Sequence, residues 1–119
     1  MTGEDFDAFC AALPGATHVV QWGGASVWKV GGKVFAIGGW SDGPEFAVTF
    51  KCSDTSFAML RDAPGIRPAP YLASRGLSWL QRTGAKAMSD SELRDYIRRS
   101  HNLVAAGLTR KARSALGLP

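Results

Sequence analysis

The sequence predicts an α+β fold, a two-layer sandwich in which helices pack on one face of an antiparallel β-meander. Three observations support this class: strand-like alternation in residues 27–51, an amphipathic helical pattern near the N-terminus, and a helix start signal at Ser89. The chain has 119 residues, with 45% hydrophobic and 20% charged residues, which are ordinary globular values. We therefore expect one domain over residues 1–119.

The meander is predicted from three strand-like runs within residues 27–51. Gly31 and Gly32 separate the first two runs, and two glycines tolerate the positive φ angles of a tight hairpin turn. The third run covers residues 45–51 and follows a stretch rich in glycine. An N-terminal strand over residues 18–22 is also expected.

Strand parity assigns side chains to the two faces of this sheet, because successive residues point to opposite sides. If Val30 pairs with Lys33, the core face carries Trp28, Val30, Phe35 and Ile37, extended by Phe46, Val48 and Phe50. The opposite face, which we expect to be exposed to solvent, carries Val27, Lys29, Val34, Ala36, Ala47, Thr49 and Lys51.

The N-terminal helix is predicted from its cap and its spacing. Thr2 can cap it, with Asp5 three residues later, and Pro14-Gly15 ends it. The residues at helical spacing that form its inner face are Phe6, Phe9, Cys10 and Leu13.

The strongest helix follows the capping box of Ser89 and Glu92. Its predicted inner stripe consists of Leu93, Tyr96, Ile97, Ser100 and Val104. Gly107 breaks or bends this helix. If Thr109 caps a new helix, two cations occupy a first turn that disfavours positive charge. We favour two explanations: the helix continues through Gly107, or the fold simply tolerates the two cations in a first turn. The alternative is that the cations bind a partner.

The segment between meander and long helix is predicted to hold a helix, a crossing and a strand. Ser53 or Asp54 caps the helix, which turns Phe57, Leu60 and Met59 inward. Residues 66–71 contain too much proline for a central strand and should cross the surface in an extended form. The strand over residues 77–82 should point Leu77 and Trp79 inward, and Ser78 and Arg82 outward.

The two cysteines, Cys10 and Cys52, have no metal or redox spacing. They indicate buried thiols in a reducing compartment, with one disulfide as the alternative. No apolar run reaches the length of a membrane span, and the N-terminus lacks a signal pattern. We expect a cytoplasmic protein that does not associate with membranes, with a monomer as the expected state.

Charge is distributed unevenly along the chain, whose net charge is +4. Residues 1–50 contain two Lys and five Asp or Glu, whereas residues 51–119 contain twelve Lys or Arg and five Asp or Glu. A basic half is a plausible footprint for a polyanion, and it is also common in proteins that bind no nucleic acid.

Catalytic motifs are absent from the sequence. There is no P-loop, no Gly-x-Ser-x-Gly elbow, no zinc spacing and no evident Ser–His–acid set. His18 and His101 lie far apart in sequence, and a lone histidine in a strand is more often structural. We therefore expect no enzyme activity, no cofactor and no metal.

Several short motifs in order resemble the MmcQ/YjbR family of small bacterial proteins. They are Leu13-Pro14-Gly15, residues 27–36 (VWKVGGKVFA), residues 63–72 (APGIRPAPYL), Ser100-His101 and residues 108–111 (LTRK). The resemblance implies a frataxin-like two-layer fold and a double-wing surface that binds double-stranded DNA. Two departures from the family pattern are His101, where a tyrosine is usual, and Trp40 in the glycine-rich loop 38–44.

DNA binding is thus the first hypothesis, with contacts mainly to phosphates and weak sequence specificity. Its alternatives are an interaction module for a protein or small ligand, using the outer sheet face or residues 68–71, and a metal-handling protein using acids of the first helix. The candidate DNA-binding residues are Lys29, Lys33, Lys51, Arg82, Arg98, Arg99, Arg110, Lys111 and Arg113.

Overall fold

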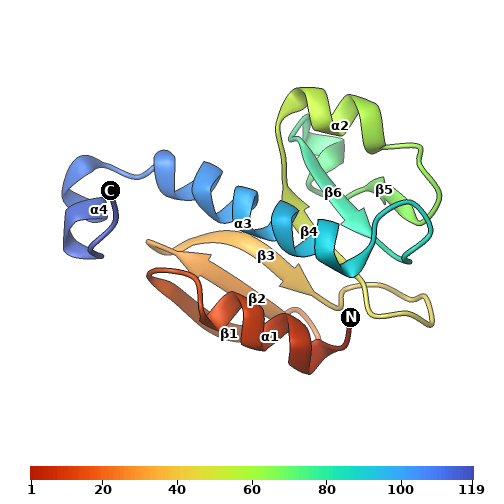
Figure 1. Ribbon diagram of the computed structural model, residues 1–119, viewed down its shortest axis with the longest axis horizontal. Coiled ribbons are helices and arrows are strands. Elements are labelled where there is room, and N and C mark those ends of the chain that lie inside the picture. The colour runs from red at the N-terminus through yellow and green to blue at the C-terminus, as the bar shows by residue number, and fades with distance from the viewer.

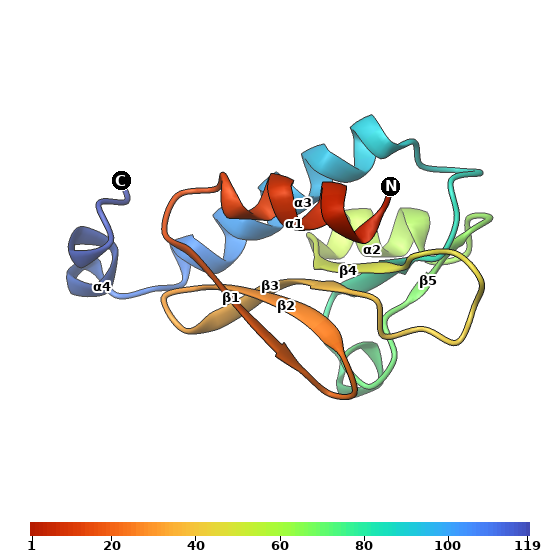
Figure 2. The same cartoon turned by 90° about the horizontal axis from the view of Figure 1, so that it is seen from below.

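Helices cover one face of a single antiparallel sheet in the computed structural model, which describes residues 1–119 except the side chain of Ser74 (Figures 1 and 2). Six strands of the described chain pair in the order β1-β2-β3-β4-β6-β5. The predicted α+β sandwich is confirmed. The elements are α1 (Gly3–Ala11), β1 (Ala16–Gln21), β2 (Ala25–Val30), β3 (Lys33–Gly38), β4 (Val48–Lys51), α2 (Asp54–Leu60), β5 (Ile66–Pro68), the 3-10 turn η1 (Ala73–Arg75), β6 (Trp79–Arg82), α3 (Asp90–Ala106) and α4 (Arg110–Ala115).

Capping boxes start the two helices that build the core. The Thr2 hydroxyl accepts a hydrogen bond from the Asp5 amide at 3.1 Å, and the Asp5 carboxylate accepts one from the Thr2 amide at 3.3 Å. Ser89 and Glu92 make the same reciprocal pair at the start of α3. Both predicted caps are confirmed, and each satisfies amide groups that the helix leaves unpaired.

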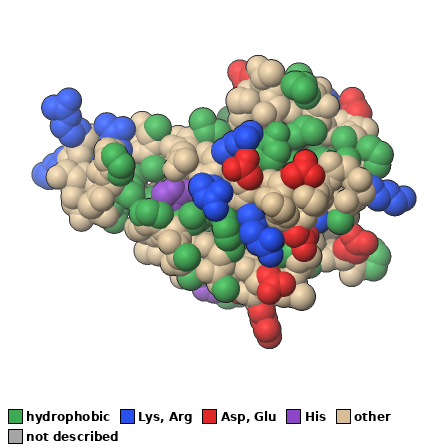
Figure 3. Space-filling view, viewed as in Figure 1, with side chains coloured by type: hydrophobic (Ala, Val, Ile, Leu, Met, Phe, Trp, Pro, Cys, Tyr) green, Lys and Arg blue, Asp and Glu red, His purple; other side chains and the backbone are tan. Residues whose placement is uncertain are grey.

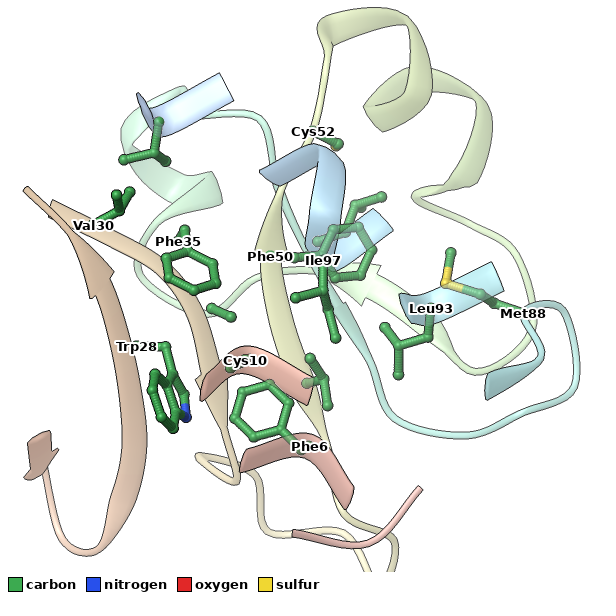
Figure 4. Close-up of a cluster of buried hydrophobic side chains, with 14 of the residues drawn as sticks. Phe6, Cys10, Trp28, Val30, Phe35, Phe50, Cys52, Met88, Leu93 and Ile97 are labelled. Atoms are coloured by element: carbon green, nitrogen blue, oxygen red, sulfur yellow. The ribbon is translucent and has the colours of Figure 1, made fainter. Parts of the chain in front are cut away.

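The main core lies between these helices and the sheet (Figure 4). Phe6 and Cys10 from α1 and Leu93 and Ile97 from α3 are completely buried. They pack on side chains of β2, β3, β4 and β6, which include Trp28, Val30, Phe35, Phe50 and Leu80. The predicted helical stripes therefore face the sheet.

The hairpin between β2 and β3 has the predicted turn but contains a β-bulge. Val30 pairs with Lys33 across Gly31 (φ 59°) and Gly32 (φ 78°). Beyond the turn, Lys29 pairs with Val34 and Trp28 with Ala36, so Phe35 is an extra residue on its strand. A bulge of this kind shifts the side-chain alternation by one position.

The bulge makes the predicted faces wrong for the second half of β3. Ala36 joins the main core, and Ile37 pairs with Val27 on the opposite face. The centre of that face is also not exposed to solvent as predicted. Ala25, Val27 and Ile37 form a second buried cluster there, and Val34, Trp40 and Leu72 pack against it.

The side chains of β6 point the opposite way from the prediction. Leu80 pairs with Phe50 and shares its core face, so Arg82 also points toward the helices and is only 4% exposed. Trp79 and Gln81 therefore lie on the other face, and Leu77 precedes the strand and is exposed. The outward placement of Arg82 and the inward placement of Leu77 were wrong, whereas Trp79 is buried as predicted but on the face opposite the helices.

The peripheral elements depart from the prediction in smaller ways. Phe46 lies before β4 and packs against the Phe6 ring, with centroids 5.7 Å apart. Ser53 caps α2, whose Met59 is 76% exposed and does not face inward. Residues 66–68 form an edge strand, as their proline content allows.

Helix α3 does not continue through Gly107. It ends at Ala106, and the Thr109 hydroxyl accepts a hydrogen bond from the Ala112 amide at 3.1 Å to cap a separate helix α4. Arg110 and Lys111 therefore do occupy a first helical turn. Within the described residues, no helix is long and apolar enough to cross a membrane.

Candidate nucleic-acid interface

Five of the nine predicted cations lie at one end of the molecule, which we call the basic end. They are Lys29 and Lys33 of the β2–β3 hairpin and Arg110, Lys111 and Arg113 of α4. The two elements meet where Leu108 covers the hairpin turn: a Cβ atom added to Gly31 would lie 2.6 Å from Leu108 Cδ1. Figures 1 and 2 show α4 beside this hairpin, at one extremity of the long axis.

The basic end contains no acidic residue. Residues 8–41 and 96–119, which supply both of its elements, include no Asp or Glu. Among the described side chains, none of the five cations forms an ion pair. Arg113 Nη1 donates to the Ala106 carbonyl at 3.4 Å. Uncompensated cations of this kind produce a local positive potential that attracts anions.

Two arginines of α3, Arg98 and Arg99, are partly neutralised by one carboxylate. Arg99 Nη2 lies 2.7 Å from Asp95, and Arg98 Nη1 lies 3.6 Å from the same side chain. Figure 3 shows Lys or Arg mixed with Asp or Glu across the middle of the helix face, whereas the end near α4 shows no acidic side chain. Arg98 and Arg99 are therefore weaker anion sites than the basic end.

Arg98 nevertheless connects α3 to the basic end. Together with Arg113, it lines a cavity of about 470 Å³ between α3, α4 and the end of the α1–β1 loop. His101 lines the same cavity, and its Nε2 lies 2.7 Å from the Pro14 carbonyl. Because a carbonyl only accepts, Nε2 donates this bond, which ties α3 to the α1–β1 loop.

The structure does not bring Lys51 and Arg82 to this surface. Lys51 is half-buried in the internal strand β4, paired with Trp79. Arg82 Nε donates to the Met88 carbonyl at 2.9 Å, and its Nη2 donates to Asp90 at 2.8 Å. Arg82 is thus a structural cation inside the fold.

The thiols are buried in the fold, and Asp7 of α1 is engaged in hydrogen bonds. Both cysteines are free and buried, and burial raises the pKa of Cys52 to about 11 and that of Cys10 further. Asp7 accepts hydrogen bonds from Ser26 Oγ at 2.6 Å and Trp28 Nε1 at 2.9 Å. Among the described side chains, no group of three His, Cys, Asp or Glu could hold a metal ion.

A second surface, not predicted as a group, is formed by aromatic residues. Trp22, Trp40 and Tyr71 come together from three loops, whereas from the sequence only residues 68–71 were a candidate surface and Trp40 was noted as a departure from the family pattern. A signal was present, because each of the three adjoins a glycine or a proline. Their contact depends on the tertiary fold and could not be derived from spacing.

These features define a small α+β protein with a helix-covered antiparallel sheet and a cationic end. The family model YjbR matches residues 11–103, which is most of the chain, so the protein belongs to the YjbR family. This confirms the resemblance of its motifs. No curated protein matches the chain.

Two solved structures are similar over nearly the whole chain. The Deinococcus radiodurans protein DR2400, with a DUF419 domain, is 25% identical, with a TM-score of 0.83 over 99% of this chain and 89% of its own. A Pseudomonas syringae protein is 17% identical, with a TM-score of 0.69 over 87% of this chain and 99% of its own. The latter likeness concerns the fold alone.

Proposed function

We propose that this protein binds double-stranded DNA without catalysis, through phosphate contacts at the basic end. The observation that carries the proposal is the meeting of two acid-free elements, the β2–β3 hairpin and α4, which places Lys29, Lys33, Arg110, Lys111 and Arg113 at one extremity. The proposal also agrees with the function that the family resemblance implies.

The chemistry of this surface favours phosphates over bases. Lys and Arg side chains neutralise phosphates and release counterions, which gives affinity independent of sequence. Helix α4 has only six residues, and its four polar side chains include no Asn or Gln that could read an adenine edge. We expect contacts mainly to phosphates and weak sequence specificity.

Fluorescence anisotropy with a labelled duplex at several salt concentrations tests the proposal. If all five cations contact phosphates, the slope of log K against log salt is about −4 to −5. Replacing Lys33, Arg110 and Lys111 together by Gln should reduce the size of this slope by about 2.7. Binding at low salt should weaken accordingly.

A matched triple variant controls for net charge. Arg61, Arg75 and Lys86 are exposed and lie away from the basic end, so replacing them by Gln removes three charges without touching the proposed surface. This control should bind like the unaltered protein. If both triple variants weaken duplex binding equally, the binding depends on net charge and not on the basic end. Absence of duplex binding at low salt would also refute the proposal.

A further inference from the structure

The rings of Trp22, Trp40 and Tyr71 form one cluster, in which Trp40 contacts both of the others, and we call this cluster the aromatic platform. Trp22 lies in the β1–β2 turn, Trp40 follows β3, and Tyr71 follows β5. The Trp22 and Trp40 rings are stacked with centroids 5.6 Å apart and planes inclined by 29°. The Trp40 and Tyr71 centroids are also 5.6 Å apart, with planes inclined by 35°.

All three platform residues adopt a left-handed backbone. Their φ angles are 52°, 62° and 67°, and no other non-glycine residue among those described has a positive φ. For a bulky side chain this conformation is a genuine outlier, and it persists only where the surrounding structure enforces it. The fold thus places three large rings at positions where glycine would be unstrained, and strain of this kind clusters at functional sites.

The three rings differ in how far they are buried. Trp40 is half-buried and covers the second apolar cluster of Ala25, Val27 and Ile37. In contrast, Trp22 is 52% exposed and Tyr71 is 73% exposed. The two outer rings therefore add exposed aromatic surface, which is typical of a binding site.

A buried hydrogen-bond network anchors the backbone of Trp40, the middle residue of the platform. Gln81 is completely buried, and its Nε2 donates to the Trp40 carbonyl at 3.1 Å and to Thr49 Oγ1 at 3.2 Å. Its Oε1 accepts from Arg67 Nε at 2.8 Å. The network fixes both the Trp40 backbone and the Arg67 guanidinium, as a pre-organised site requires.

The platform borders a cavity of about 550 Å³, a volume typical of small-ligand sites. Besides the three rings, the hydrogen-bonding side chains of Ser41, Asp42 and Arg67 line it. Its charged side chains are one carboxylate and one guanidinium, so the cavity has no net charge.

Ring geometry and charge restrict the class of ligand. Rings in mutual contact leave no slot for a proline ring and cannot surround an ammonium group as the separate walls of an aromatic cage would. A single nucleic-acid strand could stack on the rings, but its phosphates require a cationic groove, and this cavity is lined by one cation, Arg67, and one carboxylate, Asp42. A neutral ring with an apolar face and a hydroxylated edge suits both the stacking surface and the polar lining.

We propose that the aromatic platform is a binding site for a neutral saccharide. Sugar rings stack on Trp22 and Tyr71 through their C–H faces, and their hydroxyl groups exchange hydrogen bonds with Ser41, Asp42 and Arg67. This activity is separate from the DNA binding proposed above. Trp22 precedes β2 and the basic end begins where β2 ends, so the two surfaces are separated by about the length of that six-residue strand, roughly 20 Å.

Tryptophan fluorescence and calorimetric titration test the site with a panel of neutral oligosaccharides: cellohexaose, maltohexaose, mannohexaose and hexameric N-acetylglucosamine. We expect at least one to bind with a dissociation constant of about 1 mM or tighter. Trp22→Ala and Tyr71→Ala should each weaken that binding by roughly tenfold, the effect of one aromatic contact. Trp22→Tyr, which keeps a ring, should restore most of it.

Met59→Ala is the matched control, because Met59 is a similarly exposed apolar side chain on another element. It should leave saccharide binding unchanged. Far-UV circular dichroism verifies that each variant is folded, and the duplex anisotropy of the platform variants should equal that of the unaltered protein. The idea is overturned if no sugar of the panel binds, or if oligo(dT) binds at the platform in a Trp22-dependent manner and the sugars do not.

Discussion

The buried guanidinium of Arg82 depends on one carboxylate for its charge balance. Asp90 accepts from Arg82 Nη2 at 2.8 Å, and Arg82 is 4% exposed. Removing the anion leaves a buried cation without a charged partner, which costs more than the pair itself contributes. We expect Asp90→Asn to lower the free energy of unfolding by about 1–2 kcal/mol, because Asp90 is itself 41% exposed. Urea denaturation at neutral pH measures the change.

The pH dependence of this effect is a sharper check. Hydrogen bonds from the Met1 α-amino group and from Arg82 lower the pKa of the Asp90 carboxyl below its ordinary value of 3.8. A carboxyl group whose pKa is lower in the folded than in the unfolded protein stabilises the fold at pH values above its unfolded pKa. This stabilisation is lost as the pH falls through its folded pKa. The difference in unfolding free energy between the unaltered protein and Asp90→Asn should therefore shrink below about pH 4. A gap independent of pH would contradict this account.

The exposed pair of Arg61 and Asp62 provides the matching control at the scale of single residues. Its atoms are 3.9 Å apart, and Asp62 is 91% exposed. Exposed pairs contribute little because water and salt screen them. Asp62→Asn should change the unfolding free energy by less than about 0.5 kcal/mol. A larger effect of Asp90→Asn would then be due to the burial of Arg82 and not to the loss of a carboxylate charge alone.

The contact of α1 with β3 depends on the absence of a side chain at Gly38. A Cβ atom there would lie 2.6 Å from Phe6 Cε2 and 2.7 Å from Phe46 Cζ, both in packed rings. We expect Gly38→Ala to destabilise the protein by about 1–3 kcal/mol through overpacking, measured by urea or thermal denaturation. Gly43→Ala is the control, because its nearest neighbour would be Ser41 Oγ at 3.6 Å. A neutral Gly38→Ala would mean that α1 moves freely on the sheet.

Sequence patterns between neighbouring residues predicted the helices and turns well. The predictions that failed concern features set by strand pairing between distant parts of the chain. Capping boxes, the Gly31-Gly32 turn and the helical stripes depend on residues close in sequence, so they can be recognised without the fold. The bulge at Phe35 depends on how two strands pair, and it moved Ile37 to the other face. The orientation of Arg82 depends on the register of β6 against β4, which no local pattern specifies.

The sequence could indicate individual residues of the two candidate surfaces, but not which of them would lie together. Counting charges identified the cations of the hairpin and α4, yet their convergence requires Leu108 to pack on Gly31. The aromatic platform combines three loops that follow different strands, so its formation depends on the complete strand order. Sequence could name its members only one at a time.

At the scale of the whole molecule, the helices give the fold unequal local stability. Helices α1 and α3 insert buried side chains into the main core, whereas α2 has no fully buried residue and packs beside the edge strand β5. Regions with few buried contacts open locally without global unfolding. Helices α2 and α4 both lack the fully buried side chains of α1 and α3, so we expect them to be less stable locally than the centre of the fold.

The two cysteines report on these two regions. Cys10 is completely buried on α1, and Cys52 is 5% exposed immediately before α2, with its thiol 3.6 Å from the Ser78 carbonyl. Burial raises the pKa of both thiols, so neither reacts readily while it stays covered. Both belong to the main core, but Cys52 also lines a cavity between the start of α2 and α3, so we expect Cys52 to become accessible through a smaller opening than Cys10.

We therefore expect a thiol reagent to label Cys52 faster than Cys10 under native conditions. The Cys10 rate should follow the global free energy of unfolding as urea is added, while the Cys52 rate should respond weakly at low urea because little surface is exposed by local opening. Mass spectrometry of the peptides resolves the two sites, and fully denatured protein, in which both label equally, provides the control. Equal native rates with the same urea dependence would show instead that α2 unfolds together with the core.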